Sequence, residues 1–150
     1  MRINFESPNQ PEVIDLIEAL DAYQKPLYPP ESHHGIDLSA LSQSNILFAV
    51  ARNADQKAVG CAALSLNGTY AELKRMFVIP EYRDQGIGKQ LLQFLEVSAQ
   101  KQGYSHFMLE TGYLQTEALA LYQRCGYIHC APFGSYIEDP NSIFMEKRMV

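Results

Sequence analysis

Residues 80–96 read PEYRDQGIGKQLLQFLE, and this stretch decides the fold. A proline and a charged turn lead into Gly86 and Gly88, after which apolar residues recur at helical spacing. This period predicts an amphipathic helix that begins near Gln85 and stops at Gly103. The row expected along one side of this helix comprises Ile87, Leu91, Leu95 and Ser98, with Leu92 and Phe94 alongside. The apolar segment before it, TYAELKRMFVI (69–79), is strand-like, so a glycine-containing loop joins a strand to a helix.

The loop between this strand and this helix has the composition of an anion-binding site. A helix N-terminus leaves N–H groups unpaired and carries roughly half a positive charge, and glycines allow an anion to come close. Hydrogen bonds to a charged group contribute about 1.5–3 kcal/mol each, so three or four of them would hold a pyrophosphate. Arg83 and Lys89 flank the loop. Alternatively, Gly86 and Gly88 only permit tight helix packing. The sequence contains neither GxGxxG nor GxxxxGK[ST], so Rossmann and P-loop nucleotide sites are excluded.

The segments before the loop predict a three-stranded antiparallel meander. NILFAVAR (45–52) and KAVGCAALSL (57–66) are apolar and are separated by the turn-prone NADQ. Asn67-Gly68 is typical of a type I′ hairpin turn, and it leads into the strand at 69–79. At the start of the chain, residues 2–6 are expected to form a short edge strand.

Helical patterns lie before the meander. Residues 7–24 predict a helix that Ser7 or Asn9 could cap, with one apolar face made by Val13, Ile14, Ile17, Ala19 and Leu20. Prolines end this helix, and one or two short helical turns are expected near residues 38–41.

The last third of the chain continues the alternation of strands and helices. SHFMLET (105–111) predicts a strand, and QTEALALYQRC (115–125) predicts a helix with Gly126 as its left-handed cap. YIHCAPF (127–133) and SIFMEKRM (142–149) predict two closing strands. The order of all these elements predicts a mixed α/β sheet.

Length, charge and cysteine usage narrow the class of protein. A chain of 150 residues is long enough to bury a core, and we expect a single domain spanning residues 1–150. The net charge of −5 argues against a nucleic-acid partner, which would need a basic stripe. Three cysteines, none in CxxC spacing, are expected to be reduced. MRINFESPNQ has no apolar segment and no run has membrane-spanning length, so we expect a cytoplasmic protein without a membrane partner.

Two motifs resemble those of the GCN5-related N-acetyltransferase (GNAT) superfamily. The first is V-x-P followed by [RQ]-x-x-G-x-[GA] and an amphipathic helix, matched by Val78, Pro80, Arg83, Gly86 and Gly88. The second is A-x-x-L-Y-x-x-x-G-F, matched by Ala118, Leu121, Tyr122, Gly126 and Tyr127. The resemblance implies a GNAT fold, which is a mostly antiparallel sheet of roughly six to seven strands with about four helices. Residues 29–41 and 131–149 resemble a bacterial subgroup of acetyltransferases, which leaves the substrate open.

The resemblance implies acetyl-CoA as the co-substrate, bound in a V-shaped gap between the fourth and fifth strands. Met76, Phe77 and Val78 would pair with the pantetheine arm. The pyrophosphate would lie against the loop formed by Arg83, Asp84, Gln85, Gly86, Ile87, Gly88 and Lys89. Alternation places Glu72, Lys74 and Met76 on one strand face and Leu73, Arg75 and Phe77 on the other. Neither face is cleanly apolar, so we expect the period to slip at a β-bulge.

The reaction implied is direct attack of a primary amine on the thioester. Because a lysine-like amine has a pKa of ~10.4, forming the free base at pH 7 costs about 4.6 kcal/mol, so the site needs a base. Glu72 is the first candidate, acting directly or through water, with Glu110 second; Glu72 could instead be a strand carboxylate paired with Lys74 or Arg75. Tyr122 would support the departing thiolate as an acid or hydrogen-bond donor, or it could be a core aromatic.

The acceptor is expected to be a small molecule or peptide. His33 or His34 could line its pocket, although both could be surface residues, and their spacing does not favour a metal site. The segment with Tyr136, Glu138 and Asp139 could cap the same pocket and present acidic groups to a cation, or form an ordinary loop. His106 and His129 are expected to be sheet residues. Family members often dimerise, but no sequence feature specifies an interface. A non-catalytic acyl-CoA sensor, O-acetylation and another acyl donor are the alternatives.

Overall fold

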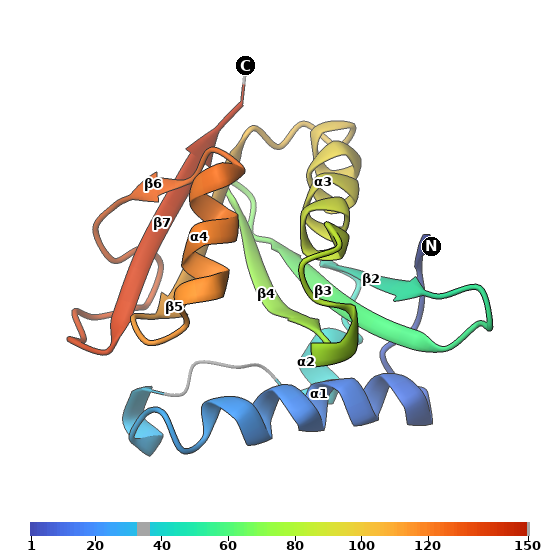
Figure 1. Ribbon diagram of the computed structural model, residues 1–150. Helices are drawn as coiled ribbons and strands as arrows, with labels where there is room; N and C mark the ends of the chain where they lie inside the picture. Colours follow the sequence, from blue (N-terminus) through green and yellow to red (C-terminus); the bar gives the residue numbers. More distant parts are fainter. Residues whose placement is uncertain (33–36, 150) are drawn as a thin grey trace.

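A computed structural model describes residues 1–32 and 37–149 of the chain (Figure 1). One seven-stranded sheet has the order β1-β2-β3-β4-β5-β7-β6, in which only the β4–β5 pair is parallel. This arrangement confirms the mixed α/β sheet and the three-stranded meander. The strands are β1 (Arg2–Phe5), β2 (Ile46–Arg52), β3 (Ala58–Leu66), β4 (Ala71–Val78), β5 (His106–Gly112), β6 (Ile128–His129) and β7 (Ser142–Arg148). The helices are α1 (Pro11–Gln24), α2 (Leu38–Leu41), α3 (Ile87–Gln100) and α4 (Thr116–Arg124), with 3-10 turns η1 (Pro30–Ser32) and η2 (Pro80–Tyr82).

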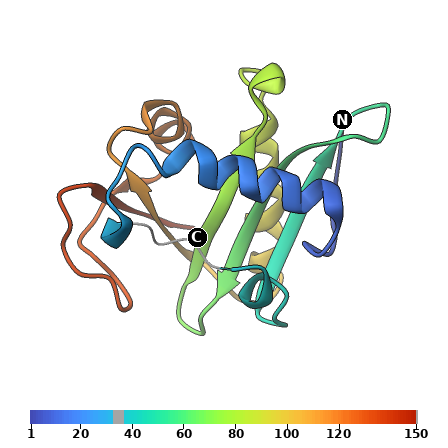
Figure 2. The same cartoon turned by 90° about the horizontal axis from the view of Figure 1, so that it is seen from below.

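Helices cover both faces of the sheet. α3 and α4 lie over one face and α1 with α2 over the other, and α1 crosses β4, β3 and β2 (Figures 1 and 2). The α3 side buries Leu91, Leu92 and Leu95 completely, and each such side chain contributes about 1.5–3 kcal/mol. The α1 side buries Val13 and Phe77 in a second cluster. The α1 face differs from the prediction, since Leu16 is buried where Ala19 is exposed.

Three local details of the fold correct the sequence predictions. The N-cap of α1 is Gln10, followed by Pro11, so a cap by Ser7 or Asn9 is wrong. The hairpin between β3 and β4 forms, but only Gly68 has a positive φ (+85°), whereas a type I′ turn needs two such residues. The strand predicted at 127–133 shrinks to Ile128–His129, because Pro132 and the loop beyond it leave the sheet. Gly103 and Gly126 have positive φ, as expected of helix stops.

An irregularity in β4 positions the site. Cys61 faces Phe77 and Ala63 faces Lys74, so β4 carries an extra residue opposite β3, which confirms the expected bulge. Arg75 lies in this bulge with φ +57°. β4 then pairs with β5 only as far as Leu73, opposite Leu109, although both strands continue. The two parallel strands therefore diverge beyond Leu73 and leave a gap between them.

Candidate active site

The open edge of β4 forms one wall of the gap. The Ile79 N–H donates to the Val59 carbonyl at 2.9 Å, and Phe77 faces Cys61, so residues 77 and 79 direct their backbone polar groups toward β3. Since successive residues of a strand alternate, Met76 and Val78 direct theirs toward the gap. The end of β4 can thus accept another extended chain or an extended ligand as a neighbour.

The start of α3 borders one hollow, which we call the donor groove. It is lined by the end of β4, by residues 82–84 and 86–89, and by the side of α4 that carries Ala118 and Leu121. Gly86 caps α3 in a left-handed conformation (φ +80°), and no side chain of the described residues caps the helix. The first α-helical bond runs from the Gln90 N–H to the Gly86 carbonyl, so the N–H groups of residues 87–89 are not used by the helix. A Cβ at Gly86 would have no protein atom within 4 Å, so the space beside it is open.

Gly88 has a different role from Gly86. A Cβ at Gly88 would lie 2.9 Å from Cδ2 of Leu121, so its absence lets α3 approach α4 closely. The packing interpretation is therefore confirmed at Gly88, and the anion-binding interpretation stays a prediction. Gly86 leaves a helix N-terminus open, and Gly88 allows tight packing.

The polar and charged residues at the start of α3 and the end of α4 make different contacts around the donor groove. Arg83 donates from Nε to the Val78 carbonyl at 2.8 Å, and its guanidinium lies over the Phe77 ring at 5.5 Å. This contact braces the end of β4. Lys89 lines the groove, and Arg124 from the last turn of α4 lines it as well. Arg124 is not among the residues predicted from the sequence, although a basic residue in the last turn of a helix is visible there. Gln85 is exposed and donates to the Glu81 carbonyl.

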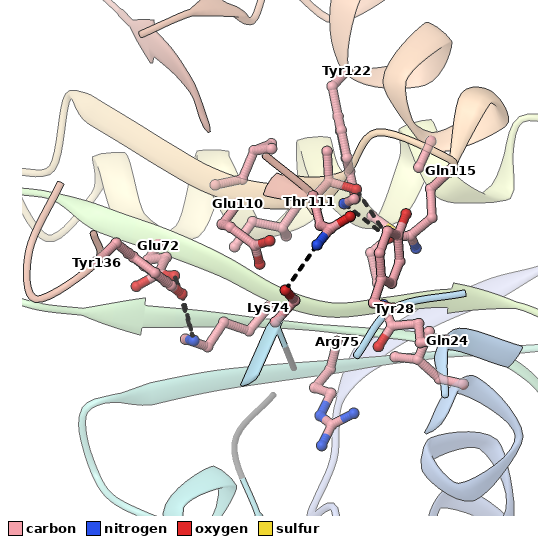
Figure 3. A pocket seen from close by; sticks show the side chains of 18 residues that line it. Gln24, Tyr28, Glu72, Lys74, Arg75, Glu110, Thr111, Gln115, Tyr122 and Tyr136 are labelled. Carbon is pink, nitrogen blue, oxygen red and sulfur yellow. Dashed lines mark hydrogen bonds and ion pairs between the residues drawn. The ribbon is translucent and has the colours of Figure 1, made fainter. Parts of the chain in front are cut away.

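A second hollow, the acceptor pocket, adjoins the donor groove (Figure 3). Leu20, Met76, Gln115 and Ala118 line both, so the two meet beside the bulge of β4. The predicted residues that line the acceptor pocket are Glu72, Glu110, Tyr122 and Tyr136. These four come from β4, β5, α4 and the loop before β7, and the fold brings them together.

Tyr122 is both a core residue and a pocket residue. It is 5% exposed, and its ring lies 6.1 Å from that of Tyr127. Its hydroxyl makes no hydrogen bond to the part of the chain that the structure describes, yet every fully covered side-chain oxygen there has a partner. The hydroxyl must therefore reach the pocket. Burial raises the pKa of Tyr122, with a smaller contribution from the nearby Cys125 and Glu110, so the phenol keeps its proton and can donate a hydrogen bond.

Glu72 is buried in the pocket wall, at 6% exposed. Its Oε2 lies 3.4 Å from Lys74 Nζ and accepts a hydrogen bond of 2.5 Å from the Tyr136 hydroxyl. Glu110 accepts a hydrogen bond from Ser142 Oγ at 2.8 Å on the neighbouring side. Glu72 thus pairs with Lys74, as one alternative predicted, but it is buried in the pocket wall rather than solvated, and its role as a base stays a prediction.

The segment after α1 closes the acceptor pocket. The Tyr28 hydroxyl accepts a hydrogen bond from the Leu114 N–H at 3.0 Å. Ser32 donates from Oγ to Asp139 at 2.6 Å and accepts a bond of 3.3 Å from the Asn141 amide. Sequence analysis missed Tyr28, Ser32 and Asn141, because no local pattern marks a contact between distant segments. His33 and His34, predicted for this wall, lie outside the described residues.

Three further observations concern a metal site, the histidine His106 and a membrane span. In residues 1–32 and 37–149, no group of three or more His, Cys, Asp or Glu side chains could hold a metal ion. His106 pairs with Glu146 at 2.8 Å within the sheet, as expected of a sheet residue. None of the described helices combines the length and apolar character needed to cross a membrane.

Comparisons with known proteins agree with this geometry. Residues 14–127 match the acetyltransferase (GNAT) family model. An IAA acetyltransferase from Azospirillum brasilense is 46% identical over 144 residues, which is 95% of this chain and 94% of that protein. The uncharacterized N-acetyltransferase YsnE from Bacillus subtilis is 35% identical over 152 residues, covering 99% of this chain and 100% of that protein.

Solved structures share the fold. A Klebsiella pneumoniae protein named as an acyl-CoA N-acyltransferase superposes with a TM-score of 0.85 at 35% identity, over 99% of this chain and 97% of that one. The PaiA N-acetyltransferase from Thermoplasma acidophilum, in complex with coenzyme A, has a TM-score of 0.73 at 21% identity over 99% and 100% of the two chains. The chain therefore belongs to the acetyltransferase (GNAT) family and is an acyltransferase.

Proposed function

We propose that this protein transfers an acetyl group from acetyl-CoA to a primary amine of a small polar molecule. One observation carries the proposal. The donor groove and the acceptor pocket meet at the bulge of β4, and an uncharged phenol, Tyr122, and a carboxylate, Glu72, both line the pocket that opens into the groove there. Acyl transfer between two bound molecules requires such an arrangement, in which each molecule enters from its own side.

The donor groove fits acetyl-CoA. The N–H groups at the start of α3, from Ile87 to Lys89, would hold the pyrophosphate, with added positive charge from Lys89 and Arg124. The outward polar groups of Met76 and Val78 would pair with the pantetheine amides. Bound in this way, the co-substrate supplies an activated acetyl thioester where the groove meets the pocket. Arg83 lines the same groove and already donates to the Val78 carbonyl, so it would hold the end of β4 beside the co-substrate.

The acceptor pocket fits an ammonium group that must lose a proton. Glu72 supplies a buried carboxylate, and Glu110 lies on the adjacent strand. We assign Glu72 as the group that receives the proton of the amine, directly or through a water molecule, and Glu110 as the alternative. The segment with Tyr28 and Ser32 encloses the pocket, which favours a small molecule over a peptide as the acceptor.

Tyr122 would act on the leaving sulfur. A phenol with its pKa raised by burial remains protonated throughout the working pH range, so its hydroxyl can donate to the forming thiolate. Full proton transfer from a phenol of pKa ~10 to a thiolate of pKa ~8.5 is uphill by about 2 kcal/mol even without burial. Hydrogen bonding to the thiolate is therefore the role that the phenol can perform best.

A screen of acceptors tests the proposal. The purified protein is incubated with acetyl-CoA and a panel of small amines, amino alcohols and peptides, and free CoA thiol is measured. Since a relative is named IAA acetyltransferase, IAA belongs in the panel. Saturable thiol release with a small amine, and an acetylated amine in the product by mass spectrometry, is the expected result. Tight acetyl-CoA binding with no transfer to any compound would instead favour the sensor, and an acetylated hydroxyl would show O-acetylation.

A further inference from the structure

Three side chains form a wall at the far end of the acceptor pocket. The Tyr136 hydroxyl donates to Glu72 Oε2 at 2.5 Å and accepts a bond of 3.0 Å from Lys74 Nζ. Lys74 Nζ also lies 3.4 Å from the same carboxylate oxygen (Figure 3). The same three residues line a more open depression on the other side, bordered by Asn67, Tyr70 and residues 134–137. Glu72, Lys74 and Tyr136 thus separate the pocket from the outside.

The two carboxylate oxygens of Glu72 have different hydrogen-bond partners. Oε2 receives both the phenol and the ammonium group. Oε1 accepts no hydrogen bond from residues 1–32 or 37–149, yet every completely covered side-chain oxygen or nitrogen there has a partner. Oε1 is therefore not completely covered, and the spaces that Glu72 lines are the acceptor pocket and the outer depression. One oxygen holds the side chain in place, and the other is available to a ligand.

Tyr136 is well suited to hold Glu72. Its ring packs edge-on against Phe133 at 5.1 Å and lies 5.4 Å from the ring of Phe144, while Lys74 Nζ lies 5.6 Å from its centroid. Burial raises the pKa of Tyr136, and the charge of Glu72 raises it further, so the hydroxyl stays protonated and donates. Without such a donor, the terminal torsion of a glutamate is broad and either oxygen can turn in any direction.

We propose that Tyr136 is a positioning residue that fixes Glu72 so that Oε1 faces the amine of the acceptor. The inference rests on the proposed function, in which Glu72 receives the proton of that amine. Tyr136 itself stays outside the reaction and acts only through Glu72, with Lys74 keeping the carboxylate charge balanced. The acceptor is accordingly a cationic amine whose nitrogen lies against Oε1 in the acceptor pocket.

A double-mutant cycle tests this coupling. Tyr136→Phe keeps the ring and its contacts but removes the donor, so kcat/KM for the amine should fall roughly 10- to 100-fold. The dissociation constant of acetyl-CoA, measured by calorimetry, should not change. In a Glu72→Gln background the same substitution should change kcat/KM by less than about threefold, since its effect passes through Glu72. Tyr70→Phe is the matched control: Tyr70 contacts the same Phe133 ring at 5.6 Å, donates no hydrogen bond to Glu72, and should behave as wild type.

Each outcome separates the inference from the proposed function. Wild-type activity in Tyr136→Phe, or an equal loss in both backgrounds, overturns the positioning role while the transferase remains. Wild-type activity in Glu72→Gln removes Glu72 from the chemistry and overturns the inference as well. Failure of the wild type to acetylate any amine overturns the proposed function itself. If Glu72→Gln is too slow to assay, the cycle is measured on the dissociation constant of the amine with CoA bound, where Tyr136→Phe should weaken binding only when Glu72 is present.

Discussion

Tyr122→Phe gives the sharpest test of the chemistry, because the structure predicts a small effect on stability and a large loss of turnover. The Tyr122 hydroxyl has no hydrogen-bond partner among the described residues, so its removal leaves no polar group of theirs unsatisfied. We expect the free energy of unfolding to change by less than about 1 kcal/mol. During turnover the same hydroxyl would donate to a thiolate, and hydrogen bonds to charged groups contribute about 1.5–3 kcal/mol, so kcat should fall roughly 10- to 150-fold.

Tyr127→Phe is the matched control for this experiment. The Tyr127 ring lies 6.1 Å from that of Tyr122, but its hydroxyl donates to the buried Glu96 at 2.8 Å. Its removal leaves a carboxylate that is 2% exposed with Lys147 as the remaining partner at 3.1 Å, so stability should fall by about 1–3 kcal/mol. In a chain of this length such a loss lowers Tm by several degrees, on the order of 2–4 °C per kcal/mol.

The assay combines urea unfolding with CoA thiol release at saturating acetyl-CoA. The expected pattern is a stable but slow Tyr122→Phe and a less stable Tyr127→Phe with near wild-type kcat. If Tyr122→Phe turns over at the wild-type rate, Tyr122 serves only the core and the proposed role is wrong. A loss of stability as large as that of Tyr127→Phe would show that the hydroxyl has a structural partner.

Three further predictions follow from glycines and buried phenols. Gly86→Val should weaken acetyl-CoA binding at least about tenfold in calorimetry. Gly68→Val is the control, since Gly68 has a similar φ (+85° against +80°) and a Cβ there would also have no atom within 4 Å; it should destabilise the fold but leave the affinity for acetyl-CoA unchanged. An equal loss of affinity in both variants would show that backbone strain alone is responsible. Gly112→Ala should raise KM for the acceptor but not for acetyl-CoA, because the new Cβ would clash with the Tyr28 hydroxyl and displace the segment after α1. An unchanged KM for the acceptor would refute the proposal that this segment closes the acceptor pocket. Burial raises the pKa of four tyrosines above the ordinary value of about 10, and these are Tyr28, Tyr122, Tyr127 and Tyr136. The stability that these phenols contribute is therefore complete below that pH and is lost as pH rises toward the folded pKa values, by up to about 1.4 kcal/mol per group and pH unit. Urea unfolding between about pH 9 and 11 should show this fall, and Tyr127→Phe should make it shallower. An identical slope in Tyr127→Phe would contradict the part assigned to Tyr127.

Local patterns predicted most of the fold because the periods of its elements are visible within short windows. The helical period after Gly86 and the continuous apolar runs of β2 and β3 predicted three elements, and all three formed where expected. The bulge in β4 was also visible, as a strand whose alternation gives no apolar face. Predictions failed where a neighbouring segment decides the conformation. The cap of α1 and the turn at Gly68 depend on how the chain enters and leaves packed elements, and β6 ends where the loop from Ala131 departs from the sheet.

The sequence by itself determined the class of protein and predicted which loop would hold the donor, because glycines, a helix N-terminus and the Leu121-Tyr122 motif lie within a few residues of one another. It also indicated Glu72 and Tyr122 as candidates, without deciding between chemistry and packing. Only the tertiary structure decided how the acceptor pocket is built. Glu72 meets Tyr136 across 64 residues of chain, and Ser32 meets Asp139 across 107. No local period encodes such contacts, since they depend on how far β4 diverges from β5 and on which loops close over the gap.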